Sequence, residues 1–234
     1  MSAGGPLGRP RLHLRSVGST NQRARELAAA GAPHGTLVTA TEQTAGRGRQ
    51  GRRWVAPPGR ALLMSLVLRE WPRLLPLAAG IAVAEECGPR ASIKWPNDVL
   101  LDGGKVAGIL AEGRPREGWI VLGLGVNVAL RAEDLPVELR PVAAGLGRPP
   151  EMLDATLADL LDRLARWLTA PAGEVLDTVR ARDALTGHQV SWETGDGVAA
   201  GIDDEGRLLV DTSGGRRALG AGEVHLGPAA GTAG

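Results

Sequence analysis

The chain has 234 residues, a formal net charge of +1, 43% hydrophobic residues and 23% charged residues. This composition is typical of a globular protein, and the near-neutral charge argues against general binding to nucleic acid or membranes. No apolar run reaches the roughly 18–20 residues of a transmembrane helix. The single cysteine, Cys87, excludes an internal disulfide, and its apolar neighbours indicate a buried thiol. We therefore expect a cytoplasmic protein.

The periodicity of apolar residues predicts alternating strands and helices over most of the chain. Ser19 and Gln22 have the spacing of a capping box, so a helix is expected to begin there and to end near Gly31. The expected strands cover 12–16, 36–41, 61–68, 92–95, 99–101, 105–112 and 119–128. The expected helices cover 19–30, 74–86, 153–168 and about 174–184, with an irregular, proline-rich segment at 131–150.

The sequence pattern changes after Gly187, where short strand-like segments are separated by Gly and Asp turns. This pattern predicts a small β-barrel over residues 185–228. Residues 11–184 are expected to form an α+β domain, a mixed β-sheet with flanking helices. The ends, residues 1–10 and 229–234, are expected to be disordered because they are rich in glycine, proline and small residues.

The segment Thr44–Trp54 carries four arginines and three glycines within eight residues. Guanidinium groups match phosphate and carboxylate oxygens, and glycines allow close approach of backbone to a ligand. The segment matches G-x-G-x-x-G, but Pro57 and Pro58 prevent the helix that a dinucleotide fold needs there. A solvated surface loop is the other alternative, although such dense positive charge favours an anionic, phosphate-bearing ligand.

Two further segments carry polar groups on short strands. Lys94–Asp98 reads Lys-Trp-Pro-Asn-Asp, which is either a plain β-turn or a site in which Asp98 binds Mg²⁺ or orients an amine. Lys105 begins an otherwise apolar strand. It is either a functional lysine or a solvated lysine at the end of the strand. Gly123 and Gly125 lie inside a strand, where glycine often marks close approach of a ligand or another backbone.

Several motifs in order give the chain a family resemblance. They are residues 19–21, 42–49, 53–54, 94–98, 105–110 and 123–127. Together they resemble biotin protein ligase, over about residues 16–128 and again in the small C-terminal domain. The resemblance implies a class II synthetase-like catalytic domain followed by an SH3-like β-barrel.

The resemblance also implies a two-step reaction with ATP and Mg²⁺. In the first step, the biotin carboxylate attacks the α-phosphate of ATP, which gives biotinyl-5′-AMP and pyrophosphate. In the second, a lysine of a biotin carboxyl carrier domain attacks the acyl carbon and AMP leaves. The implied protein partner is the carrier domain of an acetyl-CoA, acyl-CoA or pyruvate carboxylase.

Residue roles follow from the same resemblance. The implied catalytic residues are Lys105, Arg49 and Asp98. The implied biotin-binding residues are Ser19, Thr20, Gln43, Gly46, Arg47, Lys105, Gly108, Ile109, Leu110, Gly123 and Gly125. The implied ATP-binding residues are Arg49, Arg52, Trp54, Lys94, Asn97, Asp98, Lys105 and Asn127. Magnesium is expected on the ATP phosphates and, as one option, on Asp98. The glycines are expected to leave room for the biotin rings, and the arginine loop to be disordered without ligand.

Other features depart from the family or favour alternatives. The motifs begin near residue 16, which leaves no room for an N-terminal helix-turn-helix, so no DNA binding is expected. The chain is expected to be a monomer or a weak homodimer. After Asn127 the sequence assigns no adenosine contacts. A lipoate–protein ligase, a nucleic-acid binder that uses the arginines and a sensor without turnover are the competing functions.

Overall fold

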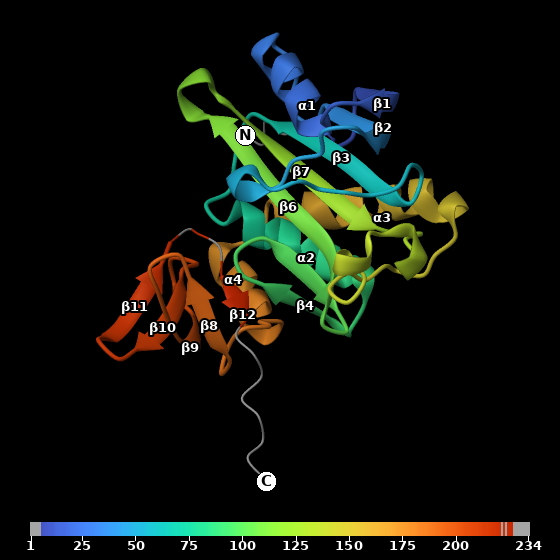
Figure 1. Ribbon diagram of the computed structural model, residues 1–234. Helices are drawn as coiled ribbons and strands as arrows, with labels where there is room; N and C mark the ends of the chain where they lie inside the picture. The colour runs from blue at the N-terminus through green and yellow to red at the C-terminus, as the bar shows by residue number, and fades with distance from the viewer. Residues whose placement is uncertain (1–5, 221, 223, 227–234) are drawn as a thin grey trace.

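A mixed sheet of seven strands forms the centre of the described chain in the computed structural model, which describes residues 6–220, 222 and 224–226 (Figure 1). Its order is β1-β2-β3-β7-β6-β5-β4. The strands are β1 (Arg11–Val17), β2 (Leu37–Gln43), β3 (Ala61–Leu68), β4 (Ala91–Lys94), β5 (Asp98–Leu101), β6 (Gly104–Arg114) and β7 (Trp119–Asn127). The β1–β2 pair is parallel and the others are antiparallel. A parallel pair needs a crossover, and α1 (Thr20–Ala29) supplies it.

Helices cover both faces of this sheet. On one face, α1 packs Ala24 and Ala28 against valines of the inner strands, such as Val121. On the other face, alternate side chains of the same strands, such as Leu122, pack against α2 (Leu75–Cys87) and α3 (Leu153–Trp167). Each buried leucine or valine contributes about 1.5–3 kcal/mol. Because α2 lies between the sheet and α3, it is apolar nearly all round, as its sequence shows.

The face that α1 covers also carries the glycines that the sequence singled out. Along β7, residues on this face alternate as Val121, Gly123, Gly125 and Asn127, while the intervening residues lie in the core. Beyond the N-terminus of α1 the sheet therefore presents backbone in place of large side chains. This part of the sheet is the floor of the site described below.

The C-terminal region is a second sheet, of five antiparallel strands within the described residues. It follows α4 (Ala172–Ala181) and has the order β11-β10-β9-β8-β12. The strands are β8 (Gln189–Trp192), β9 (Gly195–Ile202), β10 (Leu208–Thr212), β11 (Gly215–Leu219) and β12 (His225–Leu226). The expected short strands are confirmed, and all their pairings in the described residues are antiparallel. No β11–β12 pairing closes them into a barrel in the described part of this sheet.

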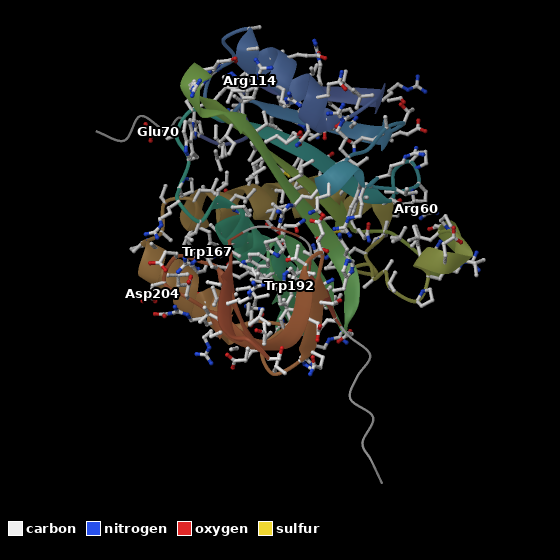
Figure 2. All side chains as sticks on the ribbon, turned by 60° about the vertical axis from the view of Figure 1, so that its left-hand side comes forward. Arg60, Glu70, Arg114, Trp167, Trp192 and Asp204 are labelled. Carbon is white, nitrogen blue, oxygen red and sulfur yellow. The ribbon has the colours of Figure 1, made fainter. Side chains whose placement is uncertain are left out.

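The second sheet shares its core with the first domain. Leu208 and Val210 of β10 belong to the same apolar cluster as α2 and α3. Trp167 at the end of α3 belongs to this cluster and is labelled in Figure 2, which also labels Arg114 at the tip of the β6–β7 hairpin. The two sheets are therefore packed against one another through α2.

The N-terminal segment differs from the expectation of disorder where it is described. Gly8 donates its amide to the carbonyl of Gly35 at 2.9 Å, and Leu7 packs on the main core. Leu7 is a large apolar side chain that packs on the core, whereas the expectation of disorder rested on the glycines, prolines and small residues around it. Residues 1–5 and 229–234 of the segments expected to be disordered lie outside the described residues.

Short 3₁₀ turns connect the main elements. They are Arg49–Gly51, Pro115–Glu117, Ala132–Asp134, Val137–Leu139 and Pro150–Met152. The segment expected to be irregular at 131–150 contains two of them and the start of a third, and no regular strand or α-helix in the described residues. None of the helices in the described ranges is long and apolar enough to cross a membrane.

Candidate active site

A cavity of about 320 Å³ lies on the face of the large sheet that carries the β7 glycines. The arginine loop, the N-terminus of α1, and strands β6 and β7 line it, together with the segment after Asn127. Its described lining includes four arginines and Lys105 but no carboxylate. The cavity is therefore shaped and charged for an anionic small molecule.

Most of the residues predicted from sequence meet at this cavity. Those that line it are Ser19, Thr20, Arg47, Arg49, Arg52, Trp54, Asn97, Lys105, Gly108, Ile109, Leu110, Gly123, Gly125 and Asn127. They come from segments more than 100 residues apart in the chain, which the sheet brings together.

A hydrogen-bonded group of buried polar side chains closes one end of the cavity. Gln43 does not line the cavity, but its Oε1 accepts from the backbone amide of Thr20 at 2.7 Å and from Thr20 Oγ1 at 3.0 Å. The first bond satisfies a free amide at the N-terminus of α1. Ser19 is the N-cap residue without a side-chain capping bond, so the predicted capping box is wrong. Gln43 takes that capping role from a neighbouring strand.

The same polar group continues through residues that sequence reasoning missed. Ser65 Oγ is 2.9 Å from Thr20 Oγ1 and 2.7 Å from Asn21 Oδ1. Asn21 Nδ2 in turn donates to Glu112 Oε2 at 2.9 Å. Ser65 is fully buried inside an apolar strand, and that polar residue in an apolar run was the signal available in the sequence. Because buried polar groups without partners are costly, this chain fixes the orientation of every member.

The space above the glycines differs from the expectation that it is open. A Cβ on Gly125 would lie 2.5 Å from Trp54 Cε2, and one on Gly108 would lie 3.0 Å from the same ring. A Cβ on Gly123 would overlap Asn21 Oδ1. Protein side chains therefore occupy the room over the glycines: Trp54 lies on the sheet itself, and Asn21 lies beside it.

Trp54 and Lys105 lie close together in the cavity. Lys105 Nζ is 5.8 Å from the centroid of the Trp54 ring, within reach of a cation–π interaction. Trp54 Nε1 is buried and has no hydrogen-bond partner among the described residues. A Cβ on Gly125 would lie 2.8 Å from this atom, so the Nε1 edge of the ring lies against the sheet.

A cationic end faces the polar end across the cavity. Lys105 Nζ pairs with Asp98 Oδ1 at 2.8 Å, and the Asp98 side chain is largely buried. Asn97 Nδ2 donates to the carbonyl of Ile109 at 3.1 Å, while its Oδ1 accepts from Arg49 Nη1 at 3.3 Å. The predicted catalytic residues Lys105, Arg49 and Asp98 thus form one connected cluster.

Besides Gln43, three predicted residues lie outside the lining of this cavity. Lys94 is the last residue of β4, where it lies opposite Asp98 of β5 in the sheet, and it does not line the cavity. Gly46 lines a neighbouring hollow under the arginine loop, where a Cβ would lie 2.4 Å from the carbonyl oxygen of Trp54. Asp98 reaches the cavity through Lys105.

The segment after Asn127, for which the sequence assigned no contacts, forms a wall of the cavity. Leu135, Leu139, Val142 and Ala143 line it, as an apolar patch beside Lys105. Among them, Leu135 is buried at 5% exposure. The irregular, proline-rich sequence carries no periodic signal, so its apolar residues could not be assigned to a face.

Residues 142–148, which we call the strap, are hydrogen-bonded to the site. The amide of Lys105 donates to Val142 at 2.8 Å, and the carbonyl of Lys105 accepts from Ala144 at 2.9 Å. Asn127 Nδ2 donates to the carbonyl of Ala144 at 2.9 Å, while Asn127 Oδ1 is buried without a partner among the described residues. The strap therefore fixes the backbone of Lys105 and orients Asn127.

An ion pair holds the far end of the strap. Arg148 pairs with Glu86, whose side chain is 2% exposed, and also donates to Thr156 Oγ1 at 2.9 Å. Arg163 pairs with the second oxygen of Glu86 at 3.1 Å. A buried carboxylate with two guanidinium partners is satisfied, and loss of one partner would leave it costly. Helices α2 and α3 thereby anchor the strap.

Comparison with known proteins identifies the family. The family model described as Biotin/lipoate A/B protein ligase family matches residues 14–127, and Biotin protein ligase C terminal domain matches residues 187–227. A biotin–[acetyl-CoA-carboxylase] ligase of Paracoccus denitrificans is 37% identical over 245 residues, which cover 92% of this chain and 99% of the relative. The chain belongs to the biotin protein ligase family. The resemblance drawn from the motifs is confirmed, and the chain is a ligase of this family.

Other members of the biotin protein ligase family match over most of the chain. The Bifunctional ligase/repressor BirA of Bacillus spizizenii is 36% identical over 242 residues, which cover 90% of this chain and 72% of the relative. A solved structure, the biotin protein ligase of Aquifex aeolicus in complex with biotin and ATP, has 28% identity and a TM-score of 0.80. It covers 94% of this chain and 99% of its own. The predicted fold class is confirmed.

Proposed function

We propose that this ligase activates biotin with ATP as biotinyl-5′-AMP and then transfers it to a lysine of a biotin carboxyl carrier domain. The observation that carries the proposal is one cavity with a hydrogen-bonding end at Thr20 and a cationic end at Lys105. The Aquifex relative binds biotin and ATP, and the Paracoccus relative is named for acetyl-CoA carboxylase. Biotin would fit the hydrogen-bonding end, and the ATP phosphates would fit the cationic end.

The polar end suits the ureido ring of biotin, which has one carbonyl acceptor and two N–H donors. Thr20 Oγ1 and Asn21 face this end, and their orientations are fixed by Gln43 and Ser65. A site whose polar groups are already oriented rejects a ligand without matching groups, because the protein groups would then remain unpaired. This argument favours biotin over lipoate, whose ring has no ureido group.

The cationic end suits the first chemical step. A carboxylate oxygen of biotin bonds to the α-phosphorus of ATP, and the bond to pyrophosphate breaks. Both reactants are anions, so Lys105 and Arg49 would offset their repulsion and stabilise charge on the phosphoryl oxygens. The Asp98 and Asn97 contacts hold those two cations in place before ATP binds.

The nucleotide would lie between Trp54 and the strap. The Trp54 ring lines the cavity and offers a stacking surface for adenine. Asn127 Oδ1 is an orphan acceptor at the same cavity, and Leu135 and Leu139 add an apolar wall. Arg47 and Arg52 on the loop are within the lining and would pair with the phosphate and carboxylate groups.

Magnesium fits this site as a partner of the ATP phosphates. The described residues contain no group of three metal-binding side chains, and Mg²⁺ usually binds through few carboxylates, waters and substrate phosphates. Asp98 is the carboxylate beside Lys105 and would be the protein ligand. When bound, the ion would neutralise charge on the leaving pyrophosphate.

The acyl adenylate is a mixed anhydride that water can hydrolyse, so the arginine loop has a second role. We propose that residues 46–53 order over the adenylate and exclude water until the carrier lysine attacks the acyl carbon. AMP then leaves and an amide bond remains. Asp98 is the residue we propose to orient the attacking amine. Ordering of the loop is expected to slow its hydrogen exchange when biotin and ATP are added.

Biotin-dependent ATP–pyrophosphate exchange tests the proposal directly, with lipoate as the parallel substrate. We expect exchange with biotin alone. Exchange with lipoate alone would assign the chain to the other branch of the matched family. Tight biotin binding without exchange would refute the enzyme and leave a sensor. Transfer is then tested by labelling of a purified carrier domain, with its target lysine replaced as the control.

A further inference from the structure

The Lys-Trp-Pro-Asn-Asp segment reaches the second sheet as well as the cavity. Trp95 is buried at 3% exposure, and its Nε1 donates to the carbonyl of Gly206 at 3.0 Å. Gly206 lies in the turn between β9 and β10, over residues 203–207. Neither the cavity lining nor the chemistry proposed above uses this contact.

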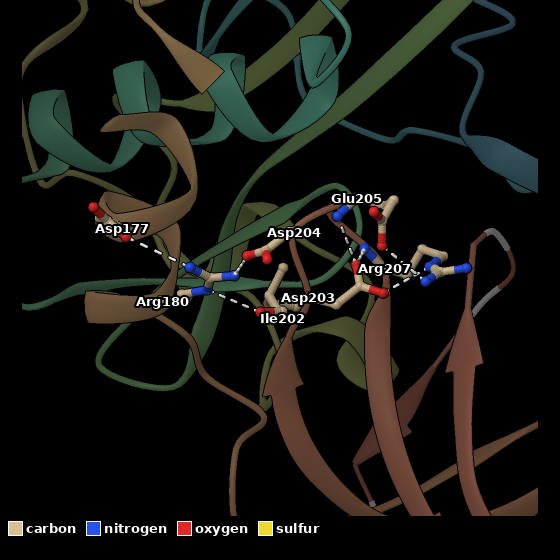
Figure 3. A network of polar contacts seen from close by, with 7 residues as sticks. All are labelled: Asp177, Arg180, Ile202, Asp203, Asp204, Glu205 and Arg207. Atoms are coloured by element: carbon tan, nitrogen blue, oxygen red, sulfur yellow. Dashed lines mark hydrogen bonds and ion pairs between the residues drawn. The ribbon is translucent and has the colours of Figure 1, made fainter. Parts of the chain in front are cut away.

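The 203–207 turn is rigid because one carboxylate organises it. Asp203 Oδ1 accepts from the amides of Glu205 at 3.0 Å and Arg207 at 2.8 Å, and its Oδ2 accepts from Arg207 Nε at 2.7 Å (Figure 3). Burial raises the pKa of Asp203, but the amide and guanidinium of Arg207 outweigh it, so the pKa is lowered overall. The carboxylate therefore stays ionised at neutral pH and holds the turn.

The turn is also fixed to the helices of the first domain. Arg180 of α4 donates to the carbonyl of Ile202 at 2.8 Å and pairs with Asp204 at 2.7 Å, as Figure 3 shows. Gly206 has φ +78°, and a Cβ there would lie 2.6 Å from Leu74 Cδ2. The turn that carries this carbonyl is thus held by Arg180 on one side and packs close to Leu74 on the other.

In the other direction along the chain, Trp95 is followed two positions later by Asn97, which holds the cationic cluster. Asn97 is bonded to Ile109 by both its side chain and its backbone and accepts from Arg49. Asp98 pairs with Lys105. A displacement of Trp95 would therefore move the two residues that position the cations.

We propose that the 203–207 turn is a structural part of the nucleotide site, and that the Trp95–Gly206 hydrogen bond makes Trp95 a positioning residue for Asn97 and Asp98. The proposal rests on the proposed function, because that function assigns the cationic cluster to ATP. It predicts that the second sheet sets the affinity for ATP and leaves the affinity for biotin unchanged, since the polar end at Thr20 has no contact with this turn among the described residues.

Trp95→Phe is the direct test, because it keeps an aromatic ring and removes the donor. We expect the KM for ATP in biotin-dependent pyrophosphate exchange to rise about tenfold, the effect of one lost hydrogen bond, with the KM for biotin unchanged. Trp167→Phe is the matched control: Trp167 is equally buried, and its Nε1 has no partner among the described residues. It should change neither KM. Equal changes in both KM values for Trp95→Phe would overturn the proposal.

Asp203→Asn gives a second test that leaves Trp95 intact. It should weaken ATP binding in calorimetry and move the indole resonance of Trp95 and the amide resonance of Asn97. Unmoved resonances, or unchanged ATP affinity, would refute the coupling. If the wild-type protein binds ATP but shows no exchange, the proposed function fails while calorimetry on Trp95→Phe and Asp203→Asn still decides this inference. Absence of ATP binding by the wild type would overturn both.

Discussion

Lys105→Ala is the most informative single change, because Lys105 lies at the cationic end of the cavity. Its Nζ is 2.8 Å from Asp98 Oδ1 and 5.8 Å from the Trp54 ring. Its backbone is fixed by the strap, so truncation of the side chain leaves the main chain in place. We expect the variant to fold and to bind biotin, but to form the adenylate slowly.

The size of the effect follows from the position of the charge. A unit charge about 4 Å from a phosphoryl oxygen contributes about 4 kcal/mol at an effective dielectric constant of about 20. The Lys105 side chain is 35% exposed, and solvent screening reduces this figure to about 3 kcal/mol. A loss of about 3 kcal/mol lowers the rate more than a hundredfold, as does removal of other donors that stabilise a transition state.

Biotin-dependent ATP–pyrophosphate exchange measures this step, and calorimetry measures biotin binding in the same preparation. Arg216→Ala is the control for net charge, because Arg216 lies on β11 in an exposed ion pair. The control should exchange at the wild-type rate. An exchange rate for Lys105→Ala within threefold of wild type, with biotin bound, would refute the assigned role.

Three further predictions concern other parts of the site and the core. Gly125→Ala would place a Cβ 2.5 Å from Trp54, so we expect altered tryptophan fluorescence and at least tenfold weaker ATP binding; an unchanged spectrum would contradict this. Ser65→Ala removes the donor to Asn21, so the KM for biotin should rise about tenfold and that for ATP should not. Partial burial raises the pKa of the Cys87 thiol to about 12, so its alkylation at pH 8 should be about a thousandfold slower than that of an exposed thiol and should accelerate as pH rises towards that pKa; a rate like that of free cysteine would refute the raised pKa.

Local patterns were sufficient to predict most elements and the cluster at the cavity. Strand β3 was predicted as 61–68 and lies at Ala61–Leu68, because it is buried on both faces and reads as a continuous apolar run. The amphipathic helix predicted at 153–168 is α3, Leu153–Trp167. The arginine loop gathers like charges that repel one another without an anionic ligand, which is why its composition indicated a site, whereas the role of Lys105 was assigned from the family resemblance.

Contacts between distant segments could not be predicted in the same way. The Trp95–Gly206 bond joins residues 111 positions apart, and nothing near Trp95 indicates a partner in the second sheet. The role of Ser65 depends on the register of β3 beside α1, which local periodicity does not define. The glycines were expected to make room for a ligand, since the sequence shows that space is needed but not which side chain fills it.

The floor of the cavity is backbone, and this has a consequence for redesign of the pocket. The glycines of the floor have no side chain left to shorten, so the cavity cannot be deepened at these positions. A biotin analogue with a larger ring can be accommodated only by trimming what lies above the floor, Trp54 or Asn21. Trimming Trp54 would also alter the proposed stacking surface for adenine, whereas Asn21 belongs to the polar end. Libraries for altered cofactor specificity should therefore begin at Asn21 and Glu112.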